Sequence, residues 1–255
     1  MHMEDGTILI TGAASGLGQA TASHLHHLGA RVGLVDLAGK GTTALGAEWG
    51  ERALGLEADV TDTDQMRAAI DTLCDWAGPL RGVVHCAGVA WAGRTLSRGG
   101  AHDLDVFAHV LKINTVGTFN VVRLAAERMA GQEMGPDGER GAIVCTASVA
   151  AFDGQIGQVA YAASKGAVAA MTLPLARDLA RSGIRVVTIA PGVFDTPMMK
   201  MLPDEARAKL AATVPFPSRL GEPSEYGALA GHILANTMLN GEVIRLDGAL
   251  RMAPR

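Results

Sequence analysis

The feature of this sequence that most limits its possible folds is a regular alternation of short apolar runs with longer helical patterns. Seven short runs are almost continuously apolar and rich in β-branched side chains. A run that is apolar at every position predicts a strand buried on both faces, and such strands are typical of parallel sheets. The seven predicted strands span residues 7–11, 31–36, 53–58, 82–87, 142–147, 184–190 and 242–247.

Helical periodicity fills the intervals between most of these runs. The predicted helices lie near residues 16–28, 62–77, 102–130, 157–182 and 222–236. Strands that alternate with helices build a parallel sheet with helices on both faces and right-handed crossovers. We therefore predict an α/β fold in which residues 1–255 form a single doubly wound domain, with a seven-stranded parallel sheet flanked by helices. Residues 191–217 contain five prolines and little periodicity, which predicts a substrate-covering loop.

Composition and charge exclude several classes of protein. Hydrophobic residues make up 48% of the chain and charged residues 19%, which excludes general disorder. A net charge of -4 argues against binding to a nucleic-acid backbone. No apolar run approaches the ~20 residues of a membrane-spanning helix, and residues 1–5 lack the features of a signal peptide. We expect a cytoplasmic protein that binds neither nucleic acid nor a membrane.

The sequence predicts no metal site. Its three cysteines are too widely spaced for a disulfide framework or a metal knuckle, so we expect reduced thiols. Three histidines between residues 24 and 27 share one predicted helix, but no acidic or cysteine partner stands near them in the sequence. Neighbouring histidines of this kind rarely complete a metal site, and a solvated helix face explains them.

A glycine-rich turn follows the first predicted strand and leads directly into a helix. Its sequence, residues 11–18, is TGAASGLG. Glycines allow a tight turn and let the backbone approach a pyrophosphate, whose charge then lies at the helix N-terminus. This context predicts a Rossmann-like sheet that binds a dinucleotide. The predicted contacts in the turn are Gly12, Ser15, Gly16, Leu17 and Gly18.

Asp36 ends the second predicted strand, 18 residues beyond Gly18. A carboxylate at this place can accept hydrogen bonds from the hydroxyls of an adenosine ribose, and it repels a 2′-phosphate. Leu37 follows it and is uncharged, while Lys40, the nearest base, is assigned to the next loop or helix. These residues predict NAD rather than NADP as the cofactor. The alternative role for Asp36 is that of a helix N-cap.

Tyr161 and Lys165 stand four residues apart in a predicted helix, so both project from one face. Ser148 follows a predicted strand, 13 residues before Tyr161. A phenol with a pKa of about 10 is a poor base at neutral pH, but a neighbouring ammonium stabilises the phenolate. We predict that Tyr161 is the general base when a secondary alcohol is oxidised and the general acid in the reverse direction. Ser148 would hydrogen-bond the substrate oxygen.

These motifs together resemble the short-chain dehydrogenase/reductase family over essentially the whole chain. The resemblance implies that Asn114 is a fourth catalytic residue, which anchors a water, and that Lys165 also holds the nicotinamide ribose. One departure is visible: His85 and Cys86 replace two asparagines of the family, which we expect to weaken a hydrogen bond between strands. By resemblance, further cofactor contacts are Asp59, Val60, Cys86, Ala87, Gly88, Tyr161, Pro191, Gly192, Val193 and Thr196.

Three segments resemble one subgroup of that family, the type-2 3-hydroxyacyl-CoA dehydrogenases, which include 17β-hydroxysteroid dehydrogenase type 10. They are residues 148–155, 214–221 and 240–252. The resemblance implies a small-molecule substrate of the acyl-CoA or hydroxysteroid type, contacted by Ser148, Gln155 and Tyr161. No cluster of Arg or Lys marks a site for the CoA phosphates, so CoA rests on the resemblance alone.

Two alternative functions are disfavoured by the same residues. A 3-oxoacyl-carrier-protein reductase usually uses NADPH, which Asp36 disfavours. A non-catalytic dinucleotide sensor is expected to lack the tyrosine or the lysine, and this chain has both.

The predicted helix at 157–182 is apolar nearly all round, so one face covers the sheet and the other requires a partner. We expect this helix and residues 116–130 to form a dimer interface, and the family resemblance implies a homotetramer.

Overall fold

Seven strands form one parallel sheet, as the apolar runs predict. The computed structural model describes residues 4, 6–135, 138–200 and 202–254, so residues 1–3, 5, 136–137 and 255, and Met201 of the expected loop, lie outside it. The strand order is β3-β2-β1-β4-β7-β8-β9, and every pairing in this sheet is parallel. The order reverses between β1 and β4, where doubly wound sheets bind ligands. The strands are β1 (Thr7–Thr11), β2 (Arg31–Asp36), β3 (Ala53–Glu57), β4 (Leu80–His85), β7 (Gly141–Thr146), β8 (Ile184–Pro191) and β9 (Val243–Leu246).

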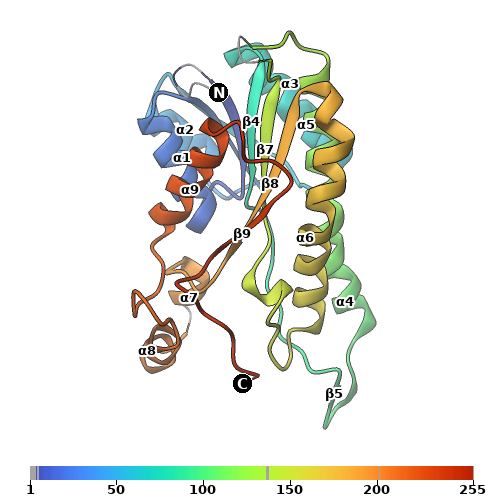
Figure 1. Ribbon diagram of the computed structural model, residues 1–255, viewed down its shortest axis with the longest axis vertical. Coiled ribbons are helices and arrows are strands. Elements are labelled where there is room, and N and C mark those ends of the chain that lie inside the picture. Colours follow the sequence, from blue (N-terminus) through green and yellow to red (C-terminus); the bar gives the residue numbers. More distant parts are fainter. Residues whose placement is uncertain (1–3, 5, 136–137, 201, 255) are drawn as a thin grey trace.

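Helices cover both faces of the sheet (Figure 1). One layer contains α1 (Gly16–His27), α2 (Thr42–Trp49) and α9 (Pro223–Ala235). The other contains α3 (Thr63–Ala77), α4 (Leu104–Leu111), α5 (Thr118–Ala130) and α6 (Val159–Leu179). Each face has its own apolar core: Leu9 of β1 packs towards α3, α5 and α6, whereas Ile8 and Ile10 pack towards α1 and α9. Both faces of the central strands are therefore buried, which explains why these strands are apolar at every position.

Helix α2 is not predicted by the sequence, because the centre of its contact with the sheet is backbone, flanked by the partly buried Leu45 and Trp49. Its buried residues are Thr42 and Gly46. A Cβ added at Gly46 would lie 2.5 Å from the backbone nitrogen of Gly55 on β3, so helix and strand touch through two glycines. This close backbone contact produces no helical period of apolar side chains.

The predicted helix at 102–130 consists of three parts. Helix α4 is followed by a π-helical segment, Lys112–Gly117, and then by α5. The π-helical segment contains Asn114, which is fully buried. Single π turns inside helices often occur at functional sites. The apolar pattern runs through all three parts, so it does not reveal this change of winding.

Two exposed structures near the carboxyl edge of the sheet are also unpredicted. The segment at 191–217 contains α7 (Pro197–Lys200) and α8 (Asp204–Ala212), and α8 buries no residue among those described. A two-stranded hairpin, β5 (Leu96–Ser97) with β6 (Gly100–Ala101), projects from the body beside α4 (Figure 1). Neither has the apolar periodicity on which sequence-based prediction depends.

Candidate active site

The glycine-rich turn after β1 forms a cradle that fits a nicotinamide dinucleotide. A Cβ added at Gly12 would lie 2.9 Å from the Ala87 backbone nitrogen, and one added at Gly18 would lie 2.1 Å from the Gly12 carbonyl oxygen. The backbone φ is +67° at Gly12 and +55° at Gly16, which other residues rarely adopt. The turn borders a cavity of about 580 Å³ at the carboxyl ends of the strands. A side chain at Gly12 or Gly18 would break the close backbone packing that forms this wall.

Asp36 lies at the adenosine end expected of this cavity, with its carboxylate held in place. Its Oδ2 accepts a hydrogen bond from the Ala14 backbone N–H at 3.0 Å, and its Oδ1 accepts one from the Leu37 N–H at 2.9 Å. Two backbone donors fix the orientation of the carboxylate. Leu37 and Lys40 also line the cavity, so a lysine does stand near this carboxylate.

Most of the predicted cofactor contacts line this one cavity. Val193 does not; its carbonyl accepts a hydrogen bond from the Gly221 N–H at 2.9 Å, and Phe194 lines the wall beside it. The predicted contacts that line the cavity are Gly12, Ser15, Gly16, Leu17, Gly18, Asp36, Leu37, Asp59, Val60, Cys86, Ala87, Gly88, Tyr161, Lys165, Pro191, Gly192 and Thr196. Sequence reasoning missed other wall residues, among them His109, Lys112 and Ile113, which belong to no motif.

Ser148, Tyr161 and Lys165 meet at one end of the cavity. Ser148 precedes the short 3-10 helix Val149–Ala151, and its Oγ accepts a hydrogen bond from the Ala150 N–H at 3.1 Å. Tyr161 and Lys165 lie one turn apart on α6, with the Lys165 Nζ 6.0 Å from the centre of the Tyr161 ring. The three side chains are therefore placed for proton transfer to and from a bound alcohol or ketone.

Burial shifts the pKa values of the tyrosine and the lysine in opposite directions. Burial raises the pKa of Tyr161, while the hydrogen bond with Ser148 opposes that rise. Burial lowers the pKa of Lys165 from 10.5 to about 8. The Lys165 amine donates a hydrogen bond to the Thr146 carbonyl at 2.8 Å. Lys165 therefore remains mostly protonated at neutral pH, and its charge lies beside the phenol.

Asn114 lies behind the cavity wall and holds two backbone segments together. Its Oδ1 accepts a hydrogen bond from the Val89 N–H at 2.8 Å, and its Nδ2 donates to the Val89 carbonyl at 2.8 Å and to the Ser164 Oγ at 3.0 Å. Asn114 is not among the residues that line the cavity. The side chain connects the π-helical segment to α6 and to the turn after β4, next to Gly88.

The departure from the family pattern at His85 does not remove the hydrogen bond between strands. The His85 Nδ1 lies 2.8 Å from the Thr11 Oγ1, so a side-chain hydrogen bond still links β4 to β1. This corrects our expectation of a weakened connection. Burial and, to a smaller extent, the nearby charge of Lys165 lower the pKa of His85 to about 3, so the ring is neutral. Burial also raises the pKa of Cys86, which keeps its thiol protonated.

Gln155, predicted to contact the substrate, lies outside the cavity wall in this structure. Its Nε2 donates a hydrogen bond to the Ala253 carbonyl at 2.9 Å, so its amide is turned towards the C-terminal end of the chain. The apolar Phe194 and Met199 line the cavity near the predicted substrate-covering segment.

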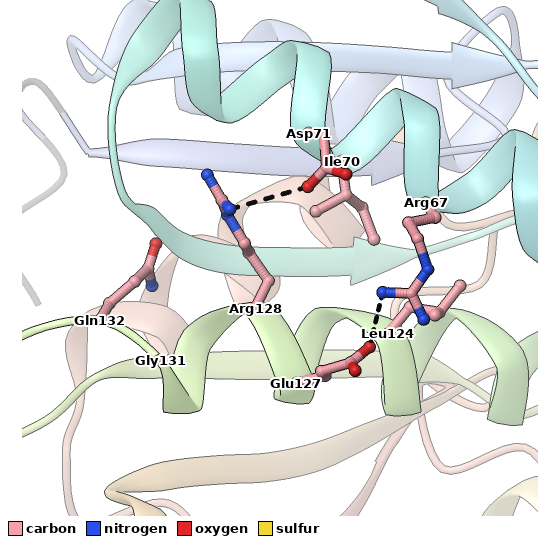
Figure 2. Close-up of a pocket in the computed structure, with 8 residues that line it drawn as sticks. All are labelled: Arg67, Ile70, Asp71, Leu124, Glu127, Arg128, Gly131 and Gln132. Atoms are coloured by element: carbon pink, nitrogen blue, oxygen red, sulfur yellow. Dashed lines mark hydrogen bonds and ion pairs between the residues drawn. The ribbon is translucent and has the colours of Figure 1, made fainter.

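A second cavity, of about 430 Å³, lies between α3 and α5 (Figure 2). Two ion pairs cross it: Arg67 with Glu127 at 2.8 Å, and Arg128 with Asp71 at 3.7 Å. These side chains are about half exposed, and such pairs contribute little to stability. None of its lining residues belongs to the catalytic set. Among the residues that the structure describes, no group of three His, Cys, Asp or Glu could hold a metal ion.

Comparison with known proteins identifies the class. Residues 6–207 match the family model of the short chain dehydrogenases, and the chain belongs to that family. It is 54% identical to the 3-hydroxyacyl-CoA dehydrogenase type-2 of Drosophila melanogaster over 248 residues, which are 96% of this chain and 97% of that protein. It is 50% identical to the protein of that name from Homo sapiens, over 96% of this chain and 95% of that protein.

A solved structure gives the same relationship in three dimensions. The crystal structure of 3-hydroxyacyl-CoA dehydrogenase type-2 from Mycobacterium avium matches this fold with a TM-score of 0.94 at 44% identity. The match covers 98% of this chain and 97% of that one. The chain is therefore an oxidoreductase of the short-chain dehydrogenase family, and membership of this family implies a nicotinamide dinucleotide cofactor.

Proposed function

We propose that this protein interconverts 3-hydroxyacyl-CoA and 3-oxoacyl-CoA with NAD as its cofactor. The observation that carries the substrate class is the full-length identity of 48–54% to relatives named 3-hydroxyacyl-CoA dehydrogenase type-2. The arrangement of Ser148, Tyr161 and Lys165 at the cavity supports the reaction type. The apolar Phe194 and Met199 support an acyl chain as the part of the substrate that enters the protein.

Each residue of the site has a defined role in this scheme. When bound, the nicotinamide accepts the hydride that leaves the alcohol carbon, or supplies it in the reverse direction. Tyr161 takes the hydroxyl proton during oxidation and returns it during reduction. Ser148 hydrogen-bonds the substrate oxygen, and Lys165 stabilises the phenolate through its positive charge. Asn114 keeps α6 and the turn after β4 in place, through Ser164 and Val89.

A substrate panel tests the proposed function. Purified protein with NADH should reduce acetoacetyl-CoA with a higher kcat/KM than it reduces an oxosteroid or an acetoacetyl thioester of acyl carrier protein. Preference for the oxosteroid would make the protein a hydroxysteroid dehydrogenase, and preference for the carrier-protein thioester would make it a reductase of that class. NADH binding with no turnover of any substrate would favour a dinucleotide sensor. Each of these three results contradicts the proposal.

The choice of NAD over NADP rests on Asp36. A carboxylate held by two backbone N–H groups would lie against a 2′-phosphate and repel it. We expect Asp36→Ala combined with Leu37→Arg to raise the ratio of kcat/KM with NADPH to kcat/KM with NADH by about 100-fold, because a repulsive charge is lost and a phosphate partner gained. Steady-state kinetics with both cofactors measure this ratio. Because Lys40 also lines the cavity, a wild-type preference for NADPH would assign that lysine to the phosphate and refute the proposal.

We propose that the outer face of α6 binds a second copy of the chain within a cytoplasmic homotetramer. By length and composition alone, Val159–Ser182 could cross a membrane, and 33% of its most apolar stretch is buried within the subunit. Val159 and Leu173 of this helix are exposed, as are Val116 and Phe119 beside it on the α4–α5 connection and α5. Helix α6 carries the catalytic pair and packs on β8, so it is part of the folded domain and not a membrane span. Two-fold pairing with a second copy would cover its exposed apolar face. The free state of the three cysteines supports a reducing compartment.

A charge on that face should separate the subunits. Ala169 packs against the core, so the outer position to substitute is the exposed Ala170. We expect Ala170→Glu to give smaller species and lower activity, since a buried glutamate at a two-fold axis meets its own copy. Multi-angle light scattering measures the mass, and Ala68→Glu on the exposed face of α3 is the matched control. A wild-type monomer at micromolar concentration would refute the proposed interface.

A further inference from the structure

Arg245 on β9 joins three segments that no catalytic motif connects. Its Nη2 donates to the Asp153 Oδ2 at 2.6 Å and to the Leu250 carbonyl at 2.8 Å, and its Nε donates to the Asp247 Oδ2 at 2.7 Å. The guanidinium carbon lies 5.4 Å from the centre of the Phe152 ring. The Arg245 side chain is 21% exposed, and that of Asp247 is 7% exposed. An arginine held by two carboxylates, a carbonyl and an aromatic ring is rigid, because each contact restricts the same planar group.

Asp153 belongs to the segment that separates the two catalytic elements. This catalytic loop, residues 152–158, begins after the 3-10 helix that follows Ser148 and ends where α6 begins. A Cβ added at Gly154 would lie 3.1 Å from the Ala162 Cβ on the first turn of α6 and 3.3 Å from the Ala150 carbonyl. The loop is therefore packed against both catalytic elements, so a shift of the loop changes the position of Ser148 relative to Tyr161.

The C-terminal tail, residues 247–254, holds the same loop from the other side. The Gln155 Nε2 donates to the Ala253 carbonyl at 2.9 Å, and the Ile156 N–H donates to the Pro254 carbonyl at 3.1 Å. The tail runs between the α7–α8 segment and α6 (Figure 1). Its contact with the α7–α8 side is the hydrogen bond from the Phe216 N–H to the Gly248 carbonyl at 3.3 Å.

Asp247 connects this network to the cofactor cavity. A Cβ added at Gly192, which lines the cavity, would lie 2.9 Å from the Cα and the Cβ of Asp247. The Gly192 N–H donates to the Leu246 carbonyl at 2.9 Å. Through Asp153 and Asp247, Arg245 thus links the catalytic loop to the wall of the cavity that contains Gly192.

We propose that Arg245 is a positioning residue that fixes the catalytic loop relative to the cofactor cavity and so sets the distance between the catalytic pair and the reacting carbon. Arg245 is not among the residues that line the cavity. It acts through Asp153 on the segment between Ser148 and Tyr161, and the C-terminal tail completes the clamp. The kinetic part of this inference rests on the proposed function, whereas the clamping of the loop is independent of it.

The test compares Arg245→Met with a matched control, Arg140→Met. Arg140 is also half-buried and donates to two carbonyls, of Gln132 and Ser182, but it precedes β7 at the opposite end of the sheet from the cavity. With acetoacetyl-CoA and NADH, we expect kcat to fall by about 10- to 100-fold in Arg245→Met, the loss that follows a small misplacement of reacting groups. The Kd for NADH, measured by fluorescence, should change by less than about threefold, because the glycine cradle is untouched.

Two conservative variants separate positioning from general stability. Arg245→Lys keeps the charge but cannot engage both carboxylates in one plane, so it should recover only part of kcat. Asp153→Asn should lower kcat in the same direction, and its effect should not add to that of Arg245→Met, because both remove one interaction. Equal losses of kcat in the Arg245→Met and Arg140→Met proteins, or full additivity with Asp153→Asn, would overturn the positioning role.

Hydrogen–deuterium exchange decides the structural part without any substrate. In the cofactor-free protein, residues 152–158 should exchange faster in Arg245→Met than in wild type and in Arg140→Met. Unchanged exchange would overturn the clamp. If wild-type protein fails to reduce acetoacetyl-CoA, the proposed function fails, while the exchange result still confirms or refutes the clamp. Asp153→Asn, which keeps the shape of its side chain, serves the same comparison if Arg245→Met does not fold.

Discussion

Tyr161→Phe should lower kcat by about 10²- to 10⁴-fold in both directions of the reaction, because only the proton-transfer group is lost. The ring keeps its place on α6 and in the cavity wall, so the Kd for NADH should remain close to that of wild type. The loss then belongs to the chemical step and not to cofactor binding. Single-turnover measurements with saturating NADH and acetoacetyl-CoA report that step directly.

The control for this prediction is the second tyrosine of the chain. Tyr226 is fully buried, and its hydroxyl lies 2.7 Å from the Thr146 Oγ1. Tyr226→Phe removes the same atom from α9, on the opposite face of the sheet from α6, and Tyr226 is not among the residues that line the cavity. It should lower stability by about 1 kcal/mol and leave most of the activity. A Tyr161→Phe protein with more than about 1% of wild-type kcat would show that another residue transfers the proton.

Lys165→Ala should damage both catalysis and cofactor binding. The amine is buried, and its charge lies next to the phenol and the predicted place of the nicotinamide ribose. Loss of a charged hydrogen-bonding group of this kind weakens binding by about 1.5–3 kcal/mol, or roughly 10- to 150-fold in the Kd for NADH. Calorimetric titration measures this change. A Lys165→Ala protein that binds NADH as wild type does would remove the lysine from the cofactor site.

Lys165 should also change how the free energy of unfolding depends on pH, and this effect can be measured without a cofactor. Its pKa in the folded protein, about 8, is below its ordinary value of 10.5. Between these two values the unfolded chain binds more protons at this group than the folded protein, so this lysine makes stability rise with pH across that window. Below pH 8 the amine is charged in both states, and the folded protein bears the full desolvation penalty. Denaturant titrations from pH 8 to 10.5 should therefore show the free energy of unfolding of wild type rising relative to that of Lys165→Met, which lacks the titrating amine.

The sheet is predictable from the sequence because burial on both faces makes its central strands almost continuously apolar. The elements that escape prediction contact the protein in other ways. Helix α2 touches β3 through Gly46 and Gly55, and α8 buries no described residue. The π-helical turn at Asn114 is hidden inside a continuous apolar pattern. For α2 and α8 a full apolar period is missing, whereas at Asn114 the apolar period continues through the change of winding. None of the three features can therefore be inferred from a single sequence.

The candidate site also contains residues that the sequence predicts and residues that it does not. Dinucleotide binding and proton transfer require fixed spacings in the sequence, and these spacings identify Gly12, Gly16, Gly18, Asp36, Tyr161 and Lys165. The structure brings all of these residues to one cavity. Residues such as His109, Lys112 and Ile113 reach the same cavity from distant elements without a motif. The role of Arg245 depends on contacts across 92 positions of sequence to Asp153, which no local pattern encodes.

Transfer of a labelled hydride tests the central claim most directly. Purified protein is incubated with acetoacetyl-CoA and NADH deuterated at C4 on one face of the ring, and the product is analysed by mass spectrometry. The account predicts 3-hydroxybutyryl-CoA with the deuterium bound at its C3 when one of the two labelled forms is used, and unlabelled product with the other. It also predicts that Tyr161→Phe forms almost none of this product. Absence of 3-hydroxybutyryl-CoA from the wild-type reaction, or product without deuterium from both labelled forms, would contradict the account.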